Sequence, residues 1–328
     1  MAEFMLTSSS VRFPATLAAF WLLGIVGGTA ANAQLAVAGH FDSAAGASGV
    51  AYDAQTGAVW ISVENEAVVR RFSAAGQPLA PVPLPAALGV HADVEVAPEE
   101  LTLSQVVVPA GSLLVIEGGD GGAVIQAIDP ATGALLATLQ TSFGAGHVVG
   151  GAYHPERNSF FLAQDREPGN PGNLLAEINP TDGSLLAIFV ITNVRPGFSV
   201  ERGDLDIAPN GNLLVASSDE TVIGEFSPLG DFIAEHPLPA GVGTLSGIAT
   251  DTERDETWAV STSGSVWRLR SGTACAADFN ADSSVNSQDF FDFLNAFFAG
   301  GPTADFNADS LVNSQDFFDF LNAFFASC

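Results

Sequence analysis

SGVAYD, residues Ser48–Asp53, is the first of a series of related segments that divide the middle of the chain into units of similar length. The other copies are Val149–His154 (VGGAYH), Gly203–Ala208 (GDLDIA), Ser246–Asp251 (SGIATD) and, more loosely, His91–Ala97 (HADVEVA). Each is short, apolar and bounded by turn residues, which is typical of a β-strand. A second apolar run follows each copy, and we interpret it as a core strand: 59–63, 113–117, 160–164, 213–217 and 257–261.

A turn sequence recurs downstream of these strand pairs. Its copies are Phe72–Gly76 (FSAAG), Ile128–Gly133 (IDPATG), Ile178–Gly183 (INPTDG) and Phe226–Gly230 (FSPLG). Pro presets φ and Gly supplies a positive φ, so these segments predict hairpin turns between a third and a fourth strand. Inner strand, core strand, turn-bearing strand and outer strand together make a four-stranded unit of about 45 residues, which is typical of a propeller blade.

The fold class that we predict for residues 34–271 is mainly β, a propeller of about five blades. The fifth unit, from Ser246, ends after 265–269 without an outer strand, whereas Leu35–Phe41 is strand-like and belongs to no unit. We therefore predict that 35–41 completes the fifth blade, because closure removes an exposed sheet edge. The alternative is a β-sandwich. The blade rhythm resembles that of secreted propellers of the NHL, SMP-30 and esterase-like type, a resemblance that implies no particular activity.

The propeller carries no motif for a catalytic nucleophile, a phosphate-binding loop or a zinc protease. Inner-strand ends converge on the axis of a propeller, so polar residues at those ends are candidates for one site that holds calcium or a substrate. The alternative is that they are strand-end polar groups facing a solvated channel. The candidates are His91, Asp93, Glu95, His147, Glu201 and Asp204.

Charge and the N-terminus indicate the compartment. Asp and Glu number 37 against 10 Lys and Arg, which excludes a nucleic-acid-binding face. An apolar run at 17–26 is followed by Ala31-Asn32-Ala33, an A-x-A cleavage site, so residues 1–33 are predicted to be a secretory signal peptide. The alternative is a retained membrane anchor. No other stretch is apolar enough to span a membrane, and we expect the mature protein to be secreted or associated with the cell surface.

The end of the chain contains an internal duplication of 23 residues. Residues 277–299 read ADFNADSSVNSQDFFDFLNAFFA, and 304–326 differ from them only at Leu311, which replaces Ser284. Oxygen ligands at loop positions 1, 3, 5 and 12, with a backbone carbonyl at position 7, form a calcium cage of the EF-hand type. The alternative is two Asp/Asn-rich turns before amphipathic helices. The predicted ligands of two Ca²⁺ ions are Asp278, Asn280, Asp282, Ser284 and Asp289, then Asp305, Asn307, Asp309, Leu311 and Asp316.

The duplicated loop and helix resemble the dockerin domain of secreted bacterial proteins. They depart from an EF-hand because position 6 is Ser283 or Ser310 instead of Gly, and position 12 is Asp instead of Glu. Over residues 272–328 the resemblance implies calcium-dependent folding and docking onto a cohesin-like partner. It also implies that either copy can serve as the binding face, through Ser287, Gln288 and Asn295 or through Ser314, Gln315 and Asn322.

Cys275 and Cys328 bracket the duplicated domain, and in an exported protein they predict a disulfide that joins its ends. Within each helix, Phe290, Phe293, Leu294 and Phe297 form one apolar stripe, with the same spacing in the second copy. Phenylalanines off the stripe either widen a small core, the interpretation we favour, or are exposed for a partner: Phe291, Phe298, Phe318 and Phe325.

Two functions are consistent with these features. The first is a secreted, non-catalytic binding or display protein whose propeller holds a carbohydrate or cell-surface ligand and whose C-terminal module docks onto a cohesin-like partner. The alternative is an extracellular propeller enzyme, a hydrolase or lyase acting on polysaccharide or lactone, tethered by the same module.

Overall fold

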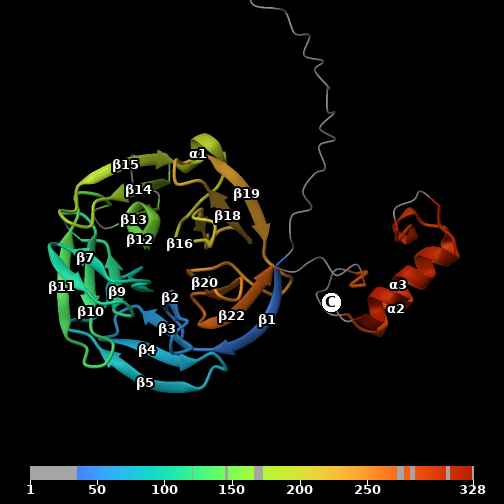
Figure 1. The fold of residues 1–328 in the computed structure, drawn as a ribbon, viewed down its shortest axis with the longest axis horizontal. Helices are drawn as coiled ribbons and strands as arrows, with labels where there is room; N and C mark the ends of the chain where they lie inside the picture. The colour runs from blue at the N-terminus through green and yellow to red at the C-terminus, as the bar shows by residue number, and fades with distance from the viewer. Residues whose placement is uncertain are drawn as a thin grey trace, which may run out of the picture. The chain divides into compact units, whose positions relative to one another are not determined.

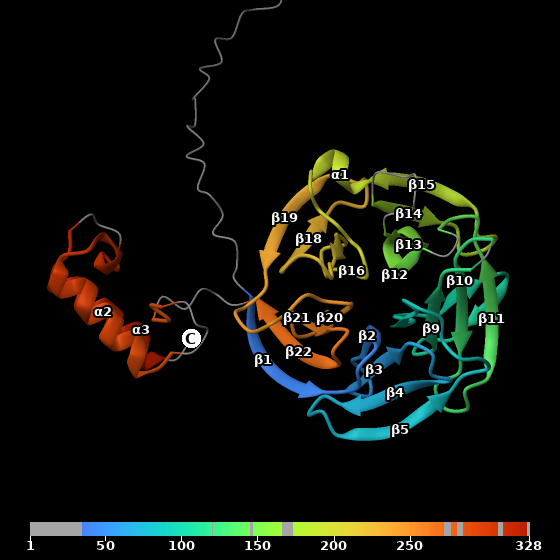
Figure 2. The same cartoon turned by 180° about the vertical axis from the view of Figure 1, so that it is seen from behind.

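The computed structural model describes residues 35–119, 121–144, 147–165, 173–271, 277–280, 285–307 and 311–326. Within them, five four-stranded antiparallel sheets are arranged around a common axis, and Figures 1 and 2 show the ring from its two ends. The chain is therefore mainly β, a five-bladed propeller followed by a small helical region, and the β-sandwich alternative is wrong.

The strands follow the predicted order from the axis outward. Blade 1 is β2 (Ala47–Asp53), β3 (Ala58–Val63), β4 (Val68–Ser73) and β5 (Pro78–Pro83). Blade 2 is β6 (Asp93–Val96), β9 (Leu113–Glu117), β10 (Val124–Ile128) and β11 (Leu135–Gln140). Blade 3 is β12 (Val148–His154), β13 (Ser159–Gln164), β14 (Leu174–Ile178) and β15 (Leu185–Val190). Blade 4 is β16 (Leu205–Ile207), β17 (Leu213–Val215), β18 (Val222–Phe226) and β19 (Phe232–Pro237).

The fifth blade joins the two ends of the propeller. Its inner three strands are β20 (Gly247–Asp251), β21 (Glu256–Val260) and β22 (Ser265–Ser271), and its outer strand is β1 (Leu35–Asp42). β1 pairs antiparallel with β22 from Leu35 opposite Ser271 to Asp42 opposite Ser265. The prediction that the first strand closes the ring is confirmed.

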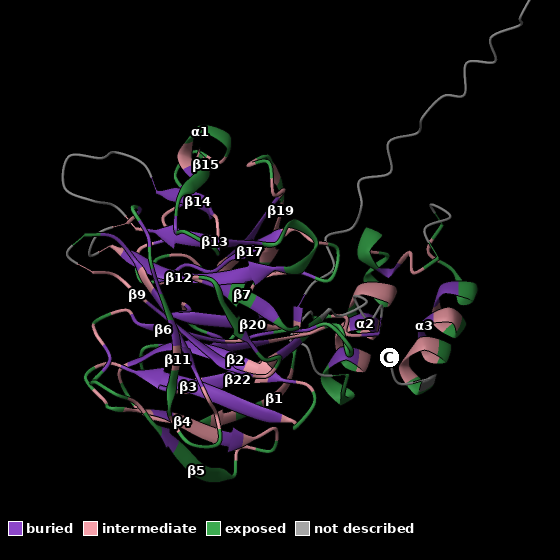
Figure 3. Ribbon diagram, turned by 60° about the vertical axis from the view of Figure 1, so that its left-hand side comes forward, coloured by how far each residue is buried: buried purple, intermediate pink, exposed green. Residues whose placement is uncertain are grey.

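Burial decreases from the axis outward because the inner strands lie between neighbouring blades (Figure 3). Every residue of β3 and β13 is buried, whereas most of β5 is exposed. Each of five apolar clusters lies between two blades; for example, Trp60 of blade 1 packs with Val94 and Leu113 of blade 2. The propeller is thus held together by five inter-blade interfaces, each built from strands with apolar residues on both faces.

The predicted hairpin turns connect the third and fourth strands of blades 1 to 4. Gly76, Gly133, Gly183 and Gly230 all have a φ between 71° and 89°, the left-handed region that glycine adopts without steric cost. In blades 2 and 3 the glycine N–H donates to the carbonyl four residues earlier, from Gly133 to Asp129 and from Gly183 to Asn179. The turn chemistry read from the sequence therefore sets the strand register.

Three short elements are added to the five four-stranded sheets. A hairpin of β7 (Leu101–Leu103) and β8 (Val106–Val108) is inserted between the first two strands of blade 2, and the short helices η1 (Pro155–Arg157) and α1 (Ile191–Val194) lie in blade 3 and after it. Among the described residues, no helix is both long and apolar enough to span a membrane. The predicted signal peptide, residues 1–33, lies outside the described residues.

The C-terminal region consists of two copies of a loop and a helix. The helices are α2 (Ser287–Ala299) and α3 (Ser314–Ala326), with η2 (Pro302–Ala304) between them. Phe293 and Phe320, equivalent in the two copies, are fully buried and stack with ring centroids 4.0 Å apart and planes 3° apart. The duplication therefore forms one small core around a pair of equivalent phenylalanines.

Candidate functional site

At two aligned positions of the inner-strand segments, only blades 2 and 4 carry acids. When the inner-strand segments that begin at Ser48, Ala92, Val149, Gly203 and Ser246 are aligned, their second positions are Gly49, Asp93, Gly150, Asp204 and Gly247. The fourth positions are Ala51, Glu95, Ala152, Asp206 and Ala249. Blades 2 and 4 thus place two carboxylates each at the axis, whereas blades 1, 3 and 5 place residues with little or no side chain there.

The glycines of this ring make room for the acids. A Cβ built on Gly49 would collide with Oδ1 of Asp93, and one built on Gly150 would collide with Oδ1 of Asp204. Each aspartate also accepts a backbone N–H of the next blade, Asp93 from Gly151 at 3.3 Å and Asp204 from Ile248 at 2.8 Å. The two carboxylates therefore occupy equivalent places in blades 2 and 4.

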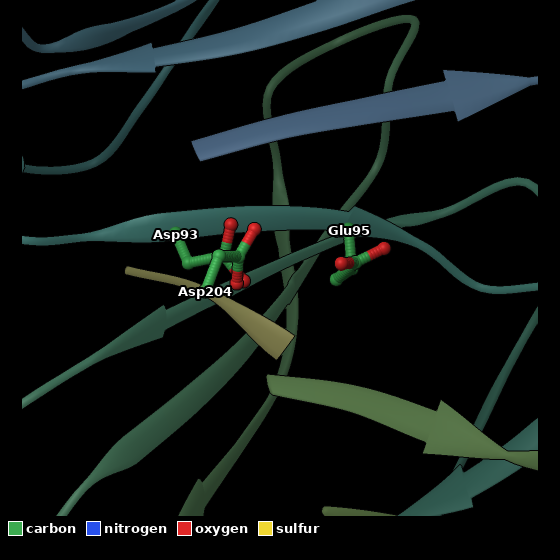
Figure 4. Close-up of side chains that lie close together, drawn as sticks. All are labelled: Asp93, Glu95 and Asp204. Carbon is green, nitrogen blue, oxygen red and sulfur yellow. The ribbon is translucent and has the colours of Figure 1, made fainter. Parts of the chain in front are cut away.

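Asp93, Glu95 and Asp204, which we call the axial cluster, converge at the centre of the propeller (Figure 4). One carboxylate oxygen from each lies within 4.8 Å of the others, and all three residues are buried. Oε1 of Glu95, a residue that is only 7% exposed, has no hydrogen-bond partner among the described residues. Carboxylate oxygens are the ligands that hard cations such as calcium prefer, so the donor set fits a divalent cation.

Burial dominates the electrostatics of the axis. It raises the pKa of Asp93 to about 8 and the pKa of Asp206 to about 6. It also raises the pKa of Glu95 and of Asp204 well above the usual range, and the neighbouring carboxylates add to the effect. The main charge effects on Asp93, Glu95 and Asp204 come from other carboxylates, which raise the pKa of each, although a side-chain hydrogen bond with Asp204 lowers the pKa of Asp93.

A cavity of about 610 Å³ opens at the ends of the inner strands. Glu95 and Asp206 line it from the axis, and Tyr52 and Tyr153 line it from blades 1 and 3. His154, also buried, lies against it with Nε2 3.0 Å from the carbonyl oxygen of Gly211. No Arg is among the described residues that line this axial cavity, and the acids at its wall favour cationic or hydroxyl-rich ligands: Asp53, Glu95, Glu156, Asp206 and Glu253.

The remaining predicted axis residues lie at the starts of the inner strands, at the other end from the cavity. Nδ1 of His91 is 3.7 Å from Oε1 of Glu64, and Nδ1 of His147 is 3.0 Å from Oδ1 of Asp165. Burial lowers the pKa of His91. His91 and Glu201 have φ of 65° and 41°, in the left-handed region that such residues seldom adopt. The six predicted residues therefore divide into the axial cluster and a separate group of His91, His147 and Glu201.

In the C-terminal module, the carboxylate at loop position 12 folds back onto its own loop. Asp289 accepts the backbone N–H of Asn280 at 3.2 Å and of Asn286 at 2.9 Å. Asp316 accepts those of Phe306 at 2.9 Å and of Asn313 at 2.7 Å, and these N–H donors lower its pKa. Both side chains are buried and also complete the first turn of a helix.

These contacts show how each loop is closed, and the donor set is one that calcium prefers. Of the predicted ligands, Asp278, Asn280, Asp289, Asp305, Asn307, Leu311 and Asp316 are described, and calcium binding by them stays a prediction. Asp282, Ser284 and Asp309 lie outside the described residues, as do the two members of the predicted disulfide, Cys275 and Cys328.

The off-stripe phenylalanines are exposed, contrary to the interpretation that they widen the core. Phe291 and Phe298 are 56% and 80% exposed, and Phe318 and Phe325 are 59% and 76% exposed. The reason is that Phe290, Phe293 and Phe297, with their counterparts, already fill the space between the helices. These four large apolar side chains therefore lie in solvent on the described surface.

The exposed phenylalanines share a helix face with the predicted partner-binding residues. Ser287, Gln288, Phe291, Asn295 and Phe298 fall within roughly a 100° arc of α2, and all five are exposed. We call this set the docking face of α2. The equivalent docking face of α3 is Ser314, Gln315, Phe318, Asn322 and Phe325, and these residues are exposed as well.

Comparison with known proteins adds little to this geometry. No protein-family model matches the sequence, and no curated protein is similar to it at a significant level. Solved structures with a related arrangement include a luciferin-regenerating enzyme, with 11% identity over 72% of this chain and 94% of that chain and a TM-score of 0.47. A protein of unknown function from Bacteroides caccae has 14% identity over 65% of this chain and 69% of that chain, with a TM-score of 0.42. A PQQ-bound aldose sugar dehydrogenase from Streptomyces coelicolor has 11% identity over 72% of this chain and 98% of that chain, with a TM-score of 0.43. At similarity this low nothing about activity or ligands follows, and the five-bladed fold rests on the sheet order described above.

Proposed function

We propose that this is a secreted, cell-surface-associated binding protein whose C-terminal module, with calcium bound, docks onto a cohesin-like partner and displays the propeller. The observation that carries the proposal is the pair of docking faces, each with two exposed phenylalanines flanked by polar residues. Single exposed apolar side chains are common, but a clustered set rimmed by polar residues is typical of interaction sites.

Calcium has two roles in this proposal. Each loop sequence contains three carboxylates, and after Arg270 the chain has no Arg, Lys or His to offset them. An ion in each loop would neutralise this repulsion and fix the start of the helix that carries the docking face. The propeller would then hold its own ligand, a carbohydrate or another cell-surface molecule, independently of the module.

Calorimetric titration tests the docking proposal. The full chain, saturated with calcium, is titrated with a cohesin-like protein purified from the cell-envelope fraction of the organism that makes this protein. We expect binding that EDTA abolishes and that a variant with alanine at Phe291, Phe298, Phe318 and Phe325 lacks, whereas the helical circular dichroism of that variant stays unchanged. Binding by the folded variant at full affinity would refute the docking faces.

A second candidate is an enzyme that acts on a polysaccharide or a lactone, tethered in the same way. The axial cavity favours it, because Asp206 at its wall has a pKa raised to about 6, within the range useful to a general acid or base. Turnover assays on lactones and polysaccharides, with the Asp206→Asn variant as the comparison, decide between the candidates. Turnover that this variant abolishes would favour the enzyme, and no turnover on any substrate would favour binding alone.

A further inference from the structure

Four carboxylates that meet at the propeller axis need a source of positive charge. Asp93, Glu95, Asp204 and Asp206 are all buried, and buried charges in proteins are paired, protonated or bound to metal. Asp93, Asp204 and Asp206 each accept backbone N–H groups, which satisfy single lone pairs. Oε1 of Glu95 accepts none from the described residues.

The spacing of the carboxylate oxygens allows all three residues of the axial cluster to bind one cation. An ion bound at about 2.4 Å from each ligand, the distance typical of calcium, requires oxygens that are at most about 4.8 Å apart. The oxygens of the axial cluster lie within 4.8 Å of one another. A proton shared between Asp93 and Asp204 would pair those two side chains but would leave Oε1 of Glu95 without a partner among the described residues.

The rest of the ring supplies space and access. Gly49, Gly150 and Gly247 occupy the places equivalent to Asp93 and Asp204, so blades 1, 3 and 5 contribute no side chain at that position. Glu95 also lines the axial cavity, which provides an entry path and room for the water ligands that calcium retains.

We propose that Asp93, Glu95 and Asp204 bind one divalent cation, calcium, between blades 2 and 4, with its open coordination positions directed to the axial cavity. The site is separate from the two predicted calcium loops of the C-terminal module. It does not depend on the docking proposal, because every ligand belongs to the propeller.

Terbium luminescence distinguishes this site from the C-terminal loops. Tb³⁺ replaces Ca²⁺ and emits when a nearby Tyr or Trp is excited. The two tyrosines of the chain, Tyr52 and Tyr153, both line the axial cavity, and the chain has no Tyr or Trp after Trp267. Sensitised emission that depends on Glu95 and Asp204 would therefore report an ion in the propeller, because the module has no Tyr or Trp of its own.

We expect sensitised emission that saturates with Tb³⁺ and is competed away by Ca²⁺. Glu95→Gln and Asp204→Asn should each weaken Tb³⁺ binding by more than about tenfold, because even residues that only orient metal ligands are worth about ten- to 100-fold in affinity. Glu156→Gln, an exposed acid at the same cavity, is the matched control and should bind Tb³⁺ like the wild type. Tryptophan emission of the variants in the absence of metal checks that they fold.

Calorimetric titration with Ca²⁺ alone counts the ions. If the module loops also bind, Glu95→Gln should take up one ion fewer than the wild type; if they do not, the wild type should bind one ion and the variant none. Failure of the loops is thereby separated from failure of the axial site. Absence of sensitised emission from the wild type, or emission unchanged in folded Glu95→Gln and Asp204→Asn, would overturn the proposal and leave protons as the compensating charge.

Discussion

Alanine substitutions can test whether the module has two equivalent docking faces. The variants are Phe298→Ala, Phe325→Ala and the double substitution. Phe298 is 80% exposed and Phe291 is 56% exposed. Taking about 200 Å² for a phenylalanine, one face then offers roughly 270 Å² of aromatic surface to a partner, or at most about 7 kcal/mol at 25 cal/mol per Å². Part of this energy is spent on ordering the interface, so truncation of one central aromatic residue is expected to cost about 2 kcal/mol.

The single variants should nevertheless bind almost normally. If either helix can meet the partner, loss of one face removes only the choice between two orientations, which is a factor of about two, or about 0.4 kcal/mol. The double variant has no intact face and should lose about 2 kcal/mol or more, a factor of about 30. Isothermal titration against the purified partner resolves these values, and Leu229→Ala, which removes a 69% exposed side chain from the propeller, is the control.

Two outcomes would contradict this reasoning. If Phe298→Ala alone costs as much as the double substitution, the partner uses a single face and the duplication serves only the core of the module. If the double variant binds like the wild type, the exposed phenylalanines are not the docking surface.

Three further predictions concern stability. Asp282→Ala combined with Asp309→Ala should abolish the helical circular dichroism of the module. Tryptophan emission, which reports only the propeller in the mature chain, should stay unchanged. EDTA should have the same effect on the helices, and a helical signal that neither the double substitution nor EDTA changes would contradict calcium-dependent folding. Cys275 and Cys328 should be oxidised, so that no thiol titrates with Ellman's reagent in denaturant, and two reactive thiols per chain would rule out the disulfide. The hydrogen bond from Arg157 lowers the pKa of Glu177 below 4.5, so the stabilisation is present above that value and is lost as the pH falls through the folded-state pKa. The difference in Tm between wild type and Arg157→Gln should therefore shrink in acid, and a pH-independent difference would contradict this assignment.

The blades could be predicted from the sequence because the residues that define each strand and turn lie close together along the chain. In blades 1 to 4 a glycine three to five residues after the end of the third strand fixes the hairpin, as at Gly76 and Gly133, and alternating turns and apolar runs then define the strand order. Ring closure by 35–41 could be predicted by counting strands, because the fifth blade lacked an outer strand and the first segment of the mature chain could supply it. The hairpin β7–β8 was not predicted, because it interrupts the repeat with a short insertion that no other blade carries among the described residues.

The axial site could be predicted only in part. Asp93, Glu95 and Asp204 were recognised as polar residues at inner strands, but Asp206 was not, and its role becomes visible only when the five inner strands are aligned position by position. We predicted that His91 and His147 belong to the same site because the inner strands converge on the axis. They lie instead at the starts of these strands, at the other end from the axial cavity. Exposure of Phe298 likewise depends on how completely the stacked Phe293 and Phe320 fill the module core, which spacing along one helix does not reveal.

Closure of the ring by β1 sets the order in which the molecule can be completed. A side-chain contact of this strand, from Arg268 to the carbonyl of Ala38, spans 230 residues of chain. During synthesis β1 is made first and β22 last. The edge of β1 therefore remains unpaired until nearly all of the propeller has left the ribosome. Such long-range pairing is slow, and unpaired edges promote aggregation. A chain truncated before blade 5 would keep both an open edge on β1 and an uncovered face on blade 4, which makes an incomplete product a ready target for proteases.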